Sequence, residues 1–483
     1  MVNNNKSELN LVPSLGIYTT IAIVVGAVIG SGIFKKPALM ASQLGSPELL
    51  LLIWVVAGII TLFGALTNAE VAGMLTETGG QYIFFQKMYG ELVAYLYGWG
   101  IFAVIQTGSI ASITYIFAEY TEFFIQFPRF SNEIEKSFSI NLPFIGSFFP
   151  LHNIGVKLVT IIVITLLTMI NYYGVKFGGR VSALFTVMKV LAILTLVYFA
   201  FVFSNGSFNH FVIESSSFTN KPEYLLTGFI AVFSGAFWAY DGWNNITYIA
   251  GEVKRPQRTI PIALGVGTLI IIAVYLLINL AYMYVLPVEL MSKSTLVAAD
   301  VANQSIGALG AAFVSAAVMI STFGTSNGTI MVSARVYFAM SRRKMFFNAI
   351  GNVHPKFKTP ANALILQCVW SCVLVLSGTF DILTDMLIFV SWIFYALGAF
   401  GVFVLRKKMP DHPRPYKVFG YPYIPAIFVI FASFFVVLTI YEDISSYQSG
   451  NSQIVDSLFG LILVAIGLPL YWFYKRRNGK ENY

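Results

Sequence analysis

Long apolar runs constrain this chain more than any other feature of its sequence. Each run is long enough for the roughly 20 residues that cross a bilayer as a helix. Charged residues make up only 11% of the chain, against about 25% in an ordinary soluble domain. The sequence therefore predicts an all-α polytopic membrane protein with 12 transmembrane helices. The runs lie near residues 17–43, 49–74, 92–125, 155–173, 182–204, 226–250, 260–286, 309–340, 361–377, 383–405, 423–441 and 455–474.

The lysine and arginine residues predict how these spans are oriented. An even number of spans places both termini on the same side of the membrane. With the N-terminus inside, cytoplasmic segments carry about three times as many basic residues as external ones, as the positive-inside rule requires. We therefore expect both termini in the cytoplasm, and the net charge of +8 needs no nucleic acid partner. The polar leader 1–14 runs directly into the first span, so no cleavable signal peptide is expected.

The cysteines and histidines indicate neither a disulfide framework nor a metal. Cys368 and Cys372 are the only cysteines and lie four residues apart on the ninth apolar run, where core packing is the expected role. The four histidines are widely separated in predicted loops, without the spacing of metal ligands. We predict no metal and no cofactor.

The first apolar run is interrupted by Gly30-Ser31-Gly32, within the segment Gly26 to Phe34. Backbone groups that a broken span leaves unpaired persist only where protein buries them or where they line a cavity. By itself, such a run of small residues more often serves close helix packing. If the helix is broken here, the amides that begin the second half suit a carboxylate, and the carbonyls before the break suit an ammonium group.

A second interruption lies in the sixth apolar run, between Ser234 and Asn244, where Gly, Asp and Asn disfavour a helix interior. The two breaks are roughly 200 residues apart, and each begins a set of five spans. This pattern predicts two inverted repeats, at about 15–205 and 225–406, followed by two additional helices at about 420–475, within a single domain 1–483. Two broken helices that face each other would suit the zwitterion of an α-amino acid.

Two charged residues lie within the predicted spans, where charge is costly and is usually functional. Lys189 lies about seven residues into the fifth span and could hold the carbonyls of an unwound backbone, or serve only as a structural cation. Asp241 lies inside the second break, where it could attract a substrate ammonium or a basic side chain, or could merely cap the following half-helix.

A set of short motifs resembles the L-type amino acid transporter (LAT) family of the amino acid-polyamine-organocation (APC) superfamily. Each motif is short, but their order and their positions on spans one, two, six and eight make the set specific, and they cover most of residues 15–408. The motifs are Gly26 to Phe34, Gly64 to Glu70, Thr78 to Tyr82, Trp238 to Asn244, Phe323 to Gly328, Ser333 to Arg335, His354-Pro355 and Thr359-Pro360.

This resemblance implies a LeuT-like fold with discontinuous helices 1 and 6, and Na⁺-independent amino acid exchange by alternating access. It places the substrate carboxylate at the amides of Ser31 and Gly32, and the amino group at the carbonyls of Val28, Trp238 and Asp241. Trp238 takes the position of an aromatic gate, and Lys189 that of the family's fifth-span lysine. The substrate-binding residues expected on this basis are Val28, Ile29, Gly30, Ser31, Gly32, Trp238, Tyr240, Asp241, Gly242, Thr325, Thr329 and Ser391, the last three as walls of the side-chain pocket.

Two departures from the family pattern refine this expectation. Animal members pair with a glycoprotein subunit through a cysteine in the loop after span three, and the loop 126–153 has no cysteine. We therefore expect a bacterial-type member of the cell membrane without a disulfide-linked heavy chain. Many members have a small residue at the position of Asp241, and members that accept basic amino acids and cystine can have Asp there. Neutral L-amino acids are the expected substrates, and whether basic amino acids are also accepted stays open.

Other functions on the same sequence stay open as alternatives. A proton-coupled symporter or a uniporter of the same fold could use Glu70, Glu119, Glu122 or Asp241 as its carboxylate. A membrane enzyme would need a metal-spaced set or a nucleophile beside a base, which the apolar runs do not contain. A sensor would need an output domain, and the tail from about Lys475 is too short for one. The expected partners are amino acids and the lipid bilayer.

Overall fold

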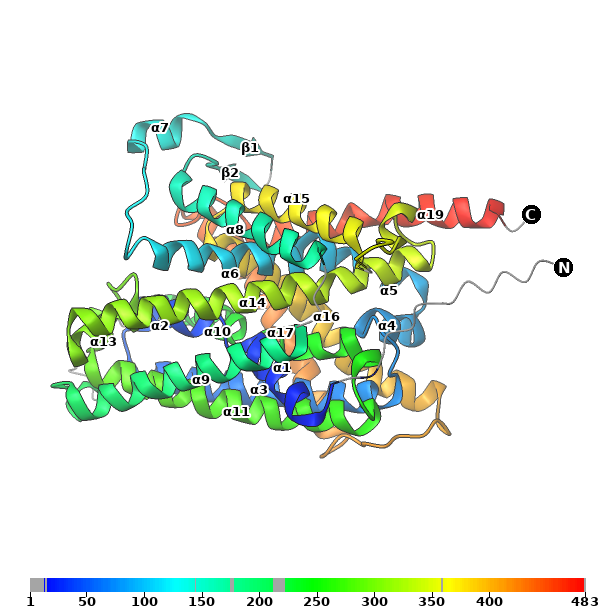
Figure 1. Ribbon diagram of the computed structural model, residues 1–483, viewed down its shortest axis with the longest axis horizontal. Helices are drawn as coiled ribbons and strands as arrows, with labels where there is room; N and C mark the ends of the chain where they lie inside the picture. Colours follow the sequence, from blue (N-terminus) through cyan, green and yellow to red (C-terminus); the bar gives the residue numbers. More distant parts are fainter. Residues whose placement is uncertain are drawn as a thin grey trace.

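The computed structural model describes residues 13, 15–143, 145–173, 178–211, 222–357 and 359–481. The rest of the predicted leader, 1–12 and 14, lies outside the described residues. Nearly all of the described chain is helical and forms one bundle (Figure 1).

The described elements follow the apolar runs closely. In chain order they are α1 (Ile17–Val28), α2 (Gly32–Leu44), α3 (Pro47–Met74), α4 (Gln81–Tyr89), α5 (Glu91–Gly100), η1 (Ile101–Ile105), α6 (Gln106–Thr121), α7 (Asn132–Ser137), β1 (Ile140–Leu142), β2 (Gly146–Phe148), α8 (Ile154–Tyr172), α9 (Gly178–Phe203), η2 (Phe208–Phe211), α10 (Pro222–Tyr240), η3 (Trp243–Glu252), α11 (Pro256–Val285), α12 (Val288–Met291), α13 (Val297–Ile306), α14 (Ala308–Arg342), η4 (Asn348–Gly351), α15 (Ala361–Ser377), α16 (Phe380–Lys408), α17 (Tyr423–Gln448), α18 (Asp456–Ala465) and α19 (Gly467–Glu481).

Ten helical segments among the described residues are long and apolar enough to cross a membrane. The ninth predicted run forms the shorter apolar helix α15, and the sixth is divided between α10 and η3. The protein is therefore a mostly helical polytopic membrane protein. Among the described residues one small hairpin lies in the loop 126–153, where β1 pairs antiparallel with β2. The sequence did not predict this hairpin.

The interruption in the first span is present at the expected position. Helix α1 ends at Val28, and Ile29 leaves the helical region with a ψ of 91°. A new helix, α2, then begins at Gly32. Three residues therefore separate the two halves of the span.

The sixth span is interrupted as well. Helix α10 ends at Tyr240, and Gly242 has a φ of +98°, a left-handed value that glycine adopts without the steric cost of a side chain. The chain continues as the 3₁₀ helix η3. A further irregularity, the π-helix η1 in the third span, was not predicted.

The bundle has two distinct ends (Figure 1). Helices α7 and α13 lie toward one end, on the left of the view, and α4 and the C-terminal part of α19 lie toward the other. We call these the α7 end and the α19 end. Both breaks lie in the interior of the bundle, since α1 packs against η3 and α2 packs against α10.

Candidate functional site

The two breaks meet at a small cavity. Helices α6 and α14 complete its wall. Its lining residues are Ala27, Val28, Gly30, Ser31, Gly32, Ser109, Ile113, Trp238, Asp241, Gly242, Asn245 and Thr329. Most of the predicted site residues are therefore brought together around one space, which we call the central cavity.

The first break presents backbone donors to the central cavity. Within the described residues, the amides of Gly30, Ser31 and Gly32 donate to no acceptor, and the buried Ser31 hydroxyl also has no partner. These groups lie at the start of α2, where the helix dipole is positive. The arrangement has the chemistry of an anion site built from main-chain N–H groups.

The predicted carbonyl acceptors are already partly engaged. The Tyr275 hydroxyl lies 3.0 Å from the Val28 oxygen and 2.8 Å from the Ala239 oxygen, so it joins the end of α1 to α10. The Trp238 oxygen accepts the Asp241 amide at 3.2 Å. Because a carbonyl oxygen has two lone pairs, each retains capacity for a further donor.

Glycine at position 32 is required by close helix packing. A Cβ added there would lie 2.5 Å from the Ala239 Cα and 2.8 Å from the Ala239 Cβ. At Gly30 the nearest atom to an added Cβ would be the Thr325 methyl group, at 3.4 Å, an ordinary van der Waals contact. Gly32 therefore allows α2 to pack on α10, whereas Gly30 leaves space at the cavity wall.

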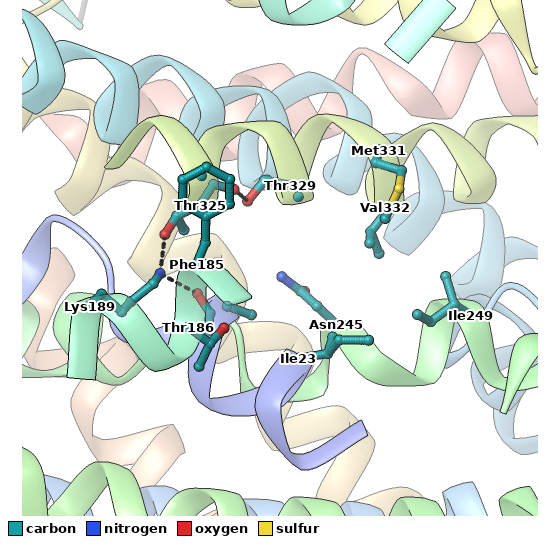
Figure 2. A pocket seen from close by; sticks show the side chains of 14 residues that line it. Ile23, Phe185, Thr186, Lys189, Asn245, Ile249, Thr325, Thr329, Met331 and Val332 are labelled. Atoms are coloured by element: carbon teal, nitrogen blue, oxygen red, sulfur yellow. Dashed lines mark hydrogen bonds between the residues drawn. The ribbon is translucent and has the colours of Figure 1, made fainter. Parts of the chain in front are cut away.

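Lys189 is buried, with 4% of its surface exposed. Its ammonium donates to the Thr325 hydroxyl at 2.7 Å (Figure 2). It also donates to the carbonyls of Gly26 at 2.9 Å and Ile29 at 2.7 Å. These three bonds match the three donors of an ammonium group. The contact thus joins α9, α14 and the end of α1, although its role in transport stays a prediction.

Asp241 lies in the second break, and its carboxylate accepts a hydrogen bond from the Tyr395 hydroxyl at 2.6 Å. The N-cap residue of the following helix η3 is Gly242. The hydrogen bond to Tyr395 joins the second break to α16. Sequence reasoning missed Tyr395, because one tyrosine in an apolar aromatic run carries no signal of its own.

A buried polar network extends from this point toward α4. The Asn244 amide donates to the Gln81 oxygen at 3.0 Å, and the Tyr97 hydroxyl donates to the same oxygen at 2.8 Å. The hydroxyls of Tyr97 and Tyr248 lie 2.7 Å apart. The network connects η3 to the segment that contains the Thr78 to Tyr82 motif.

The remaining predicted residues fall into two groups. Trp238 and Thr329 line the central cavity, and the Trp238 ring contacts Phe380 edge-on at a centroid distance of 6.0 Å. Tyr240 instead donates to the Trp54 oxygen, and Ser391 is buried on α16 without lining the cavity. The structure therefore does not bring Tyr240 and Ser391 to the cavity surface, and Ile29 and Thr325 do not line the central cavity either.

A second cavity with an empty volume of about 570 Å³ adjoins the first. The two share Ala27, Asn245 and Thr329 as lining residues. Figure 2 shows Ile249, Met331 and Val332 on one side of it and Lys189 with Phe185 on the other. We call it the adjoining cavity, and the three shared residues form the neck between the two.

Ion pairs connect α2 to two neighbouring helices. Lys35 on α2 lies 2.9 Å from Glu119, and the fully buried Lys36 lies 2.9 Å from Asp381 and 3.8 Å from Asp385 at the start of α16. The Lys36 ammonium also lies 5.0 Å from the centre of the Phe380 ring. These contacts tie α2 to α6 and α16.

Three of the four carboxylates that proton coupling could use have basic partners, and Asp241 is bonded to the Tyr395 hydroxyl instead. Glu70 accepts two hydrogen bonds from Arg406, at 2.9 and 2.7 Å, and lies 3.4 Å from Arg414. Glu119 pairs with Lys35, and Glu122 with Arg129. Both cysteines are free, and no group of three or more metal-ligating side chains lies together within the described ranges.

The fold and site define a polytopic helical membrane protein with a polar cavity between two broken spans. Residues 15–468 match the family described as amino acid permease. The chain belongs to this family, which groups transporters and not enzymes.

Three curated relatives illustrate the similarity. The serine/threonine exchanger SteT of Bacillus subtilis (strain 168) is 30% identical over 98% of this chain and 99% of its own length. The human cystine/glutamate transporter is 28% identical over 97% of this chain and 86% of its own. The mouse b(0,+)-type amino acid transporter 1 is 30% identical over 89% of this chain and 82% of its own length. The match to SteT and to LAT-type transporters agrees with the resemblance seen in the motifs.

Proposed function

We propose that this protein is a Na⁺-independent amino acid exchanger of the LAT type that works by alternating access. The observation that carries the proposal is the central cavity, in which unpaired amides at the start of α2 face the backbone of the second break. The amides would hold the substrate carboxylate, and the carbonyls of Val28, Trp238 and Asp241 its ammonium group.

The position of Lys189 supports independence from Na⁺. Its ammonium already satisfies the carbonyls of Gly26 and Ile29 at the broken first span. A resident positive charge at this place leaves no need for a bound metal cation to hold the unwound backbone.

Ion pairs between separate helices support alternating access. Lys35 and Lys36 on α2 pair with Glu119 on α6 and with Asp381 on α16. An exchanger must open its site to each side of the membrane in turn, and each of these pairs joins helices that could move apart.

Trans-stimulated uptake in proteoliposomes tests the proposal. We expect unlabelled internal amino acid to accelerate uptake of external labelled amino acid several-fold, without Na⁺ and without a pH gradient. If internal substrate has no effect and an inward pH gradient drives accumulation, the proton-coupled symporter is the better description. If substrate binds without any flux, the protein is a sensor.

The arrangement of the spans supports the finer architecture that we propose: 12 transmembrane helices in a LeuT-like 5+5 inverted repeat, with two further helices. Spans that are five positions apart in the sequence pack against each other, α2 with α10, α3 with α11, α6 with α14 and α8 with α15. Two repeats related by a pseudo-twofold axis would bring such equivalent helices together.

We further propose that the protein lies in the cell membrane with both termini in the cytoplasm and acts without a disulfide-linked heavy chain. The basic residues of the predicted inner loops and the absence of cysteine from the loop 126–153 support this. Neutral L-amino acids are the proposed substrates, and the carboxylate of Asp241 favours extension to basic ones.

A further inference from the structure

We infer that Asn245 is a specificity-determining residue that donates a hydrogen bond to an oxygen atom of the substrate side chain. The proposal rests on the proposed function, since it assigns a ligand group to the same site. Among neutral amino acids, the proposal favours those with a hydroxyl or carboxamide oxygen over those with apolar side chains of the same shape.

A hydrogen bond from Gln106 fixes the orientation of the Asn245 side-chain amide. Gln106 donates from its Nε2 to the Asn245 oxygen at 3.0 Å, and Gln106 is itself buried, with 3% of its surface exposed. Gln106 is the first residue after the π-helix η1. Such π-bulges occur frequently at functional sites, because they displace one side chain from its regular place on the helix.

With its oxygen engaged, Asn245 presents only its N–H₂ group to the site. Among the described residues, this nitrogen has no hydrogen-bond acceptor, although Asn245 is only 8% exposed. Figure 2 shows the nitrogen directed into the cavity, on the side of Phe185 and Thr186. It also lies only 3.6 Å from the place that a Cβ on Gly242 would occupy.

The nitrogen lies at the neck, between the backbone site and the adjoining cavity. A substrate held by its carboxylate and ammonium group in the central cavity would extend its side chain through this neck. The apolar residues Ile23, Ile249 and Val332 line the space beyond it. A polar atom close to the substrate Cα would therefore meet the Asn245 donor, whereas an apolar one would leave it unpaired at a cost.

Threonine and valine provide the test, because their side chains have the same shape and differ by one hydroxyl group. Competition by unlabelled L-threonine and L-valine against labelled L-threonine uptake would be measured in proteoliposomes. In the unchanged protein we expect threonine to compete about tenfold better than valine. This ratio corresponds to the free energy of one hydrogen bond at a buried site. Asn245→Leu should reduce this ratio to near one, mainly because threonine would bind more weakly.

A second variant keeps the test decisive if Asn245→Leu fails to fold. Gln106→Leu leaves Asn245 in place but frees its amide to rotate, and should lower the threonine-to-valine ratio by about twofold to threefold. The exposed Asn303→Leu is the control and should leave the ratio unchanged. An unaltered ratio in a folded Asn245 or Gln106 variant overturns the inference.

The failure of the inference can be told apart from failure of the proposed function. If the unchanged protein exchanges other amino acids but neither prefers nor accepts threonine, the role of Asn245 is wrong and exchange stands. If no amino acid stimulates uptake from the trans side, the proposed exchange fails. In that case binding can still be measured without transport. A larger rise in the melting temperature of the detergent-solubilised protein with threonine than with valine would still support the role of Asn245.

Discussion

The Lys189 ammonium lies 2.7 Å from the carbonyl oxygen of Ile29, inside the break of the first span. A side chain from the fifth span thus satisfies backbone groups that the first span exposes by unwinding. The same ammonium also bonds to Thr325 of the eighth span, so one buried charge connects three separate parts of the bundle.

Replacing Lys189 should abolish exchange while the protein still reaches the membrane. Lys189→Ala leaves the carbonyls of Gly26 and Ile29 without a donor, at about 1–3 kcal/mol for each unsatisfied group. Exchange in proteoliposomes should fall at least tenfold at equal reconstituted amounts. The exposed Lys87→Ala is the matched control, and full activity of Lys189→Ala would remove this lysine from the mechanism.

Adding a methyl group at Gly32 should be far more damaging than adding one at Gly30. The new Cβ of Gly32→Ala would lie 2.5 Å from the Ala239 Cα and would force α2 and α10 apart. Such overpacking should cost about 1–3 kcal/mol of folding free energy. The nearest atom to the new Cβ of Gly30→Ala is the Thr325 methyl group at 3.4 Å, an ordinary contact, so this variant should fold normally. Substrate binding would be followed by thermal shift, with Gly16→Ala, which has open space, as control. Equal effects at the two sites would contradict the packing argument.

Removing the carboxylate of Asp241 should change selectivity. Asp241→Gly takes away the only acidic side chain that lines the central cavity among the described residues, and it also frees Tyr395. The uptake of basic relative to neutral amino acids should fall several-fold, measured with a competition panel. The exposed Asp411→Asn serves as the control for net charge. If the ratio does not change, Asp241 has a purely structural role.

Glu70 should contribute to stability and not to coupling. The Glu70 side chain is 1% exposed and bonded to Arg406 and Arg414. Glu70→Gln would leave their charges without a carboxylate partner, which should lower the free energy of unfolding by about 3–5 kcal/mol. The melting temperature in detergent should drop clearly, whereas Glu77→Gln at the exposed pair with Arg343 should change it little. A stable Glu70→Gln protein that has lost a pH dependence of uptake would instead support proton coupling.

Local composition predicted the broken spans, because Gly30-Ser31-Gly32 and the segment around Asp241-Gly242 are poor helix formers at membrane depth. It also predicted that Lys189 is buried in the fifth span, since a charge in an apolar run must find a partner. It could not predict Tyr395, Gln106 or the β1–β2 hairpin. A tyrosine or glutamine in a long run has many possible neighbours, and only its contact partner gives it a role.

Hydropathy and helix propensity are local properties of the chain, so they were enough to predict a bundle of membrane helices with two interrupted spans. Which residues share the central cavity depends on how those helices pack. The tertiary structure brought Thr329 and Asn245 to the neck, placed Tyr240 and Ser391 away from the cavity surface, and paired Glu70 with arginines. These outcomes depend on helix rotation and on contacts between residues hundreds of positions apart, which no local pattern specifies.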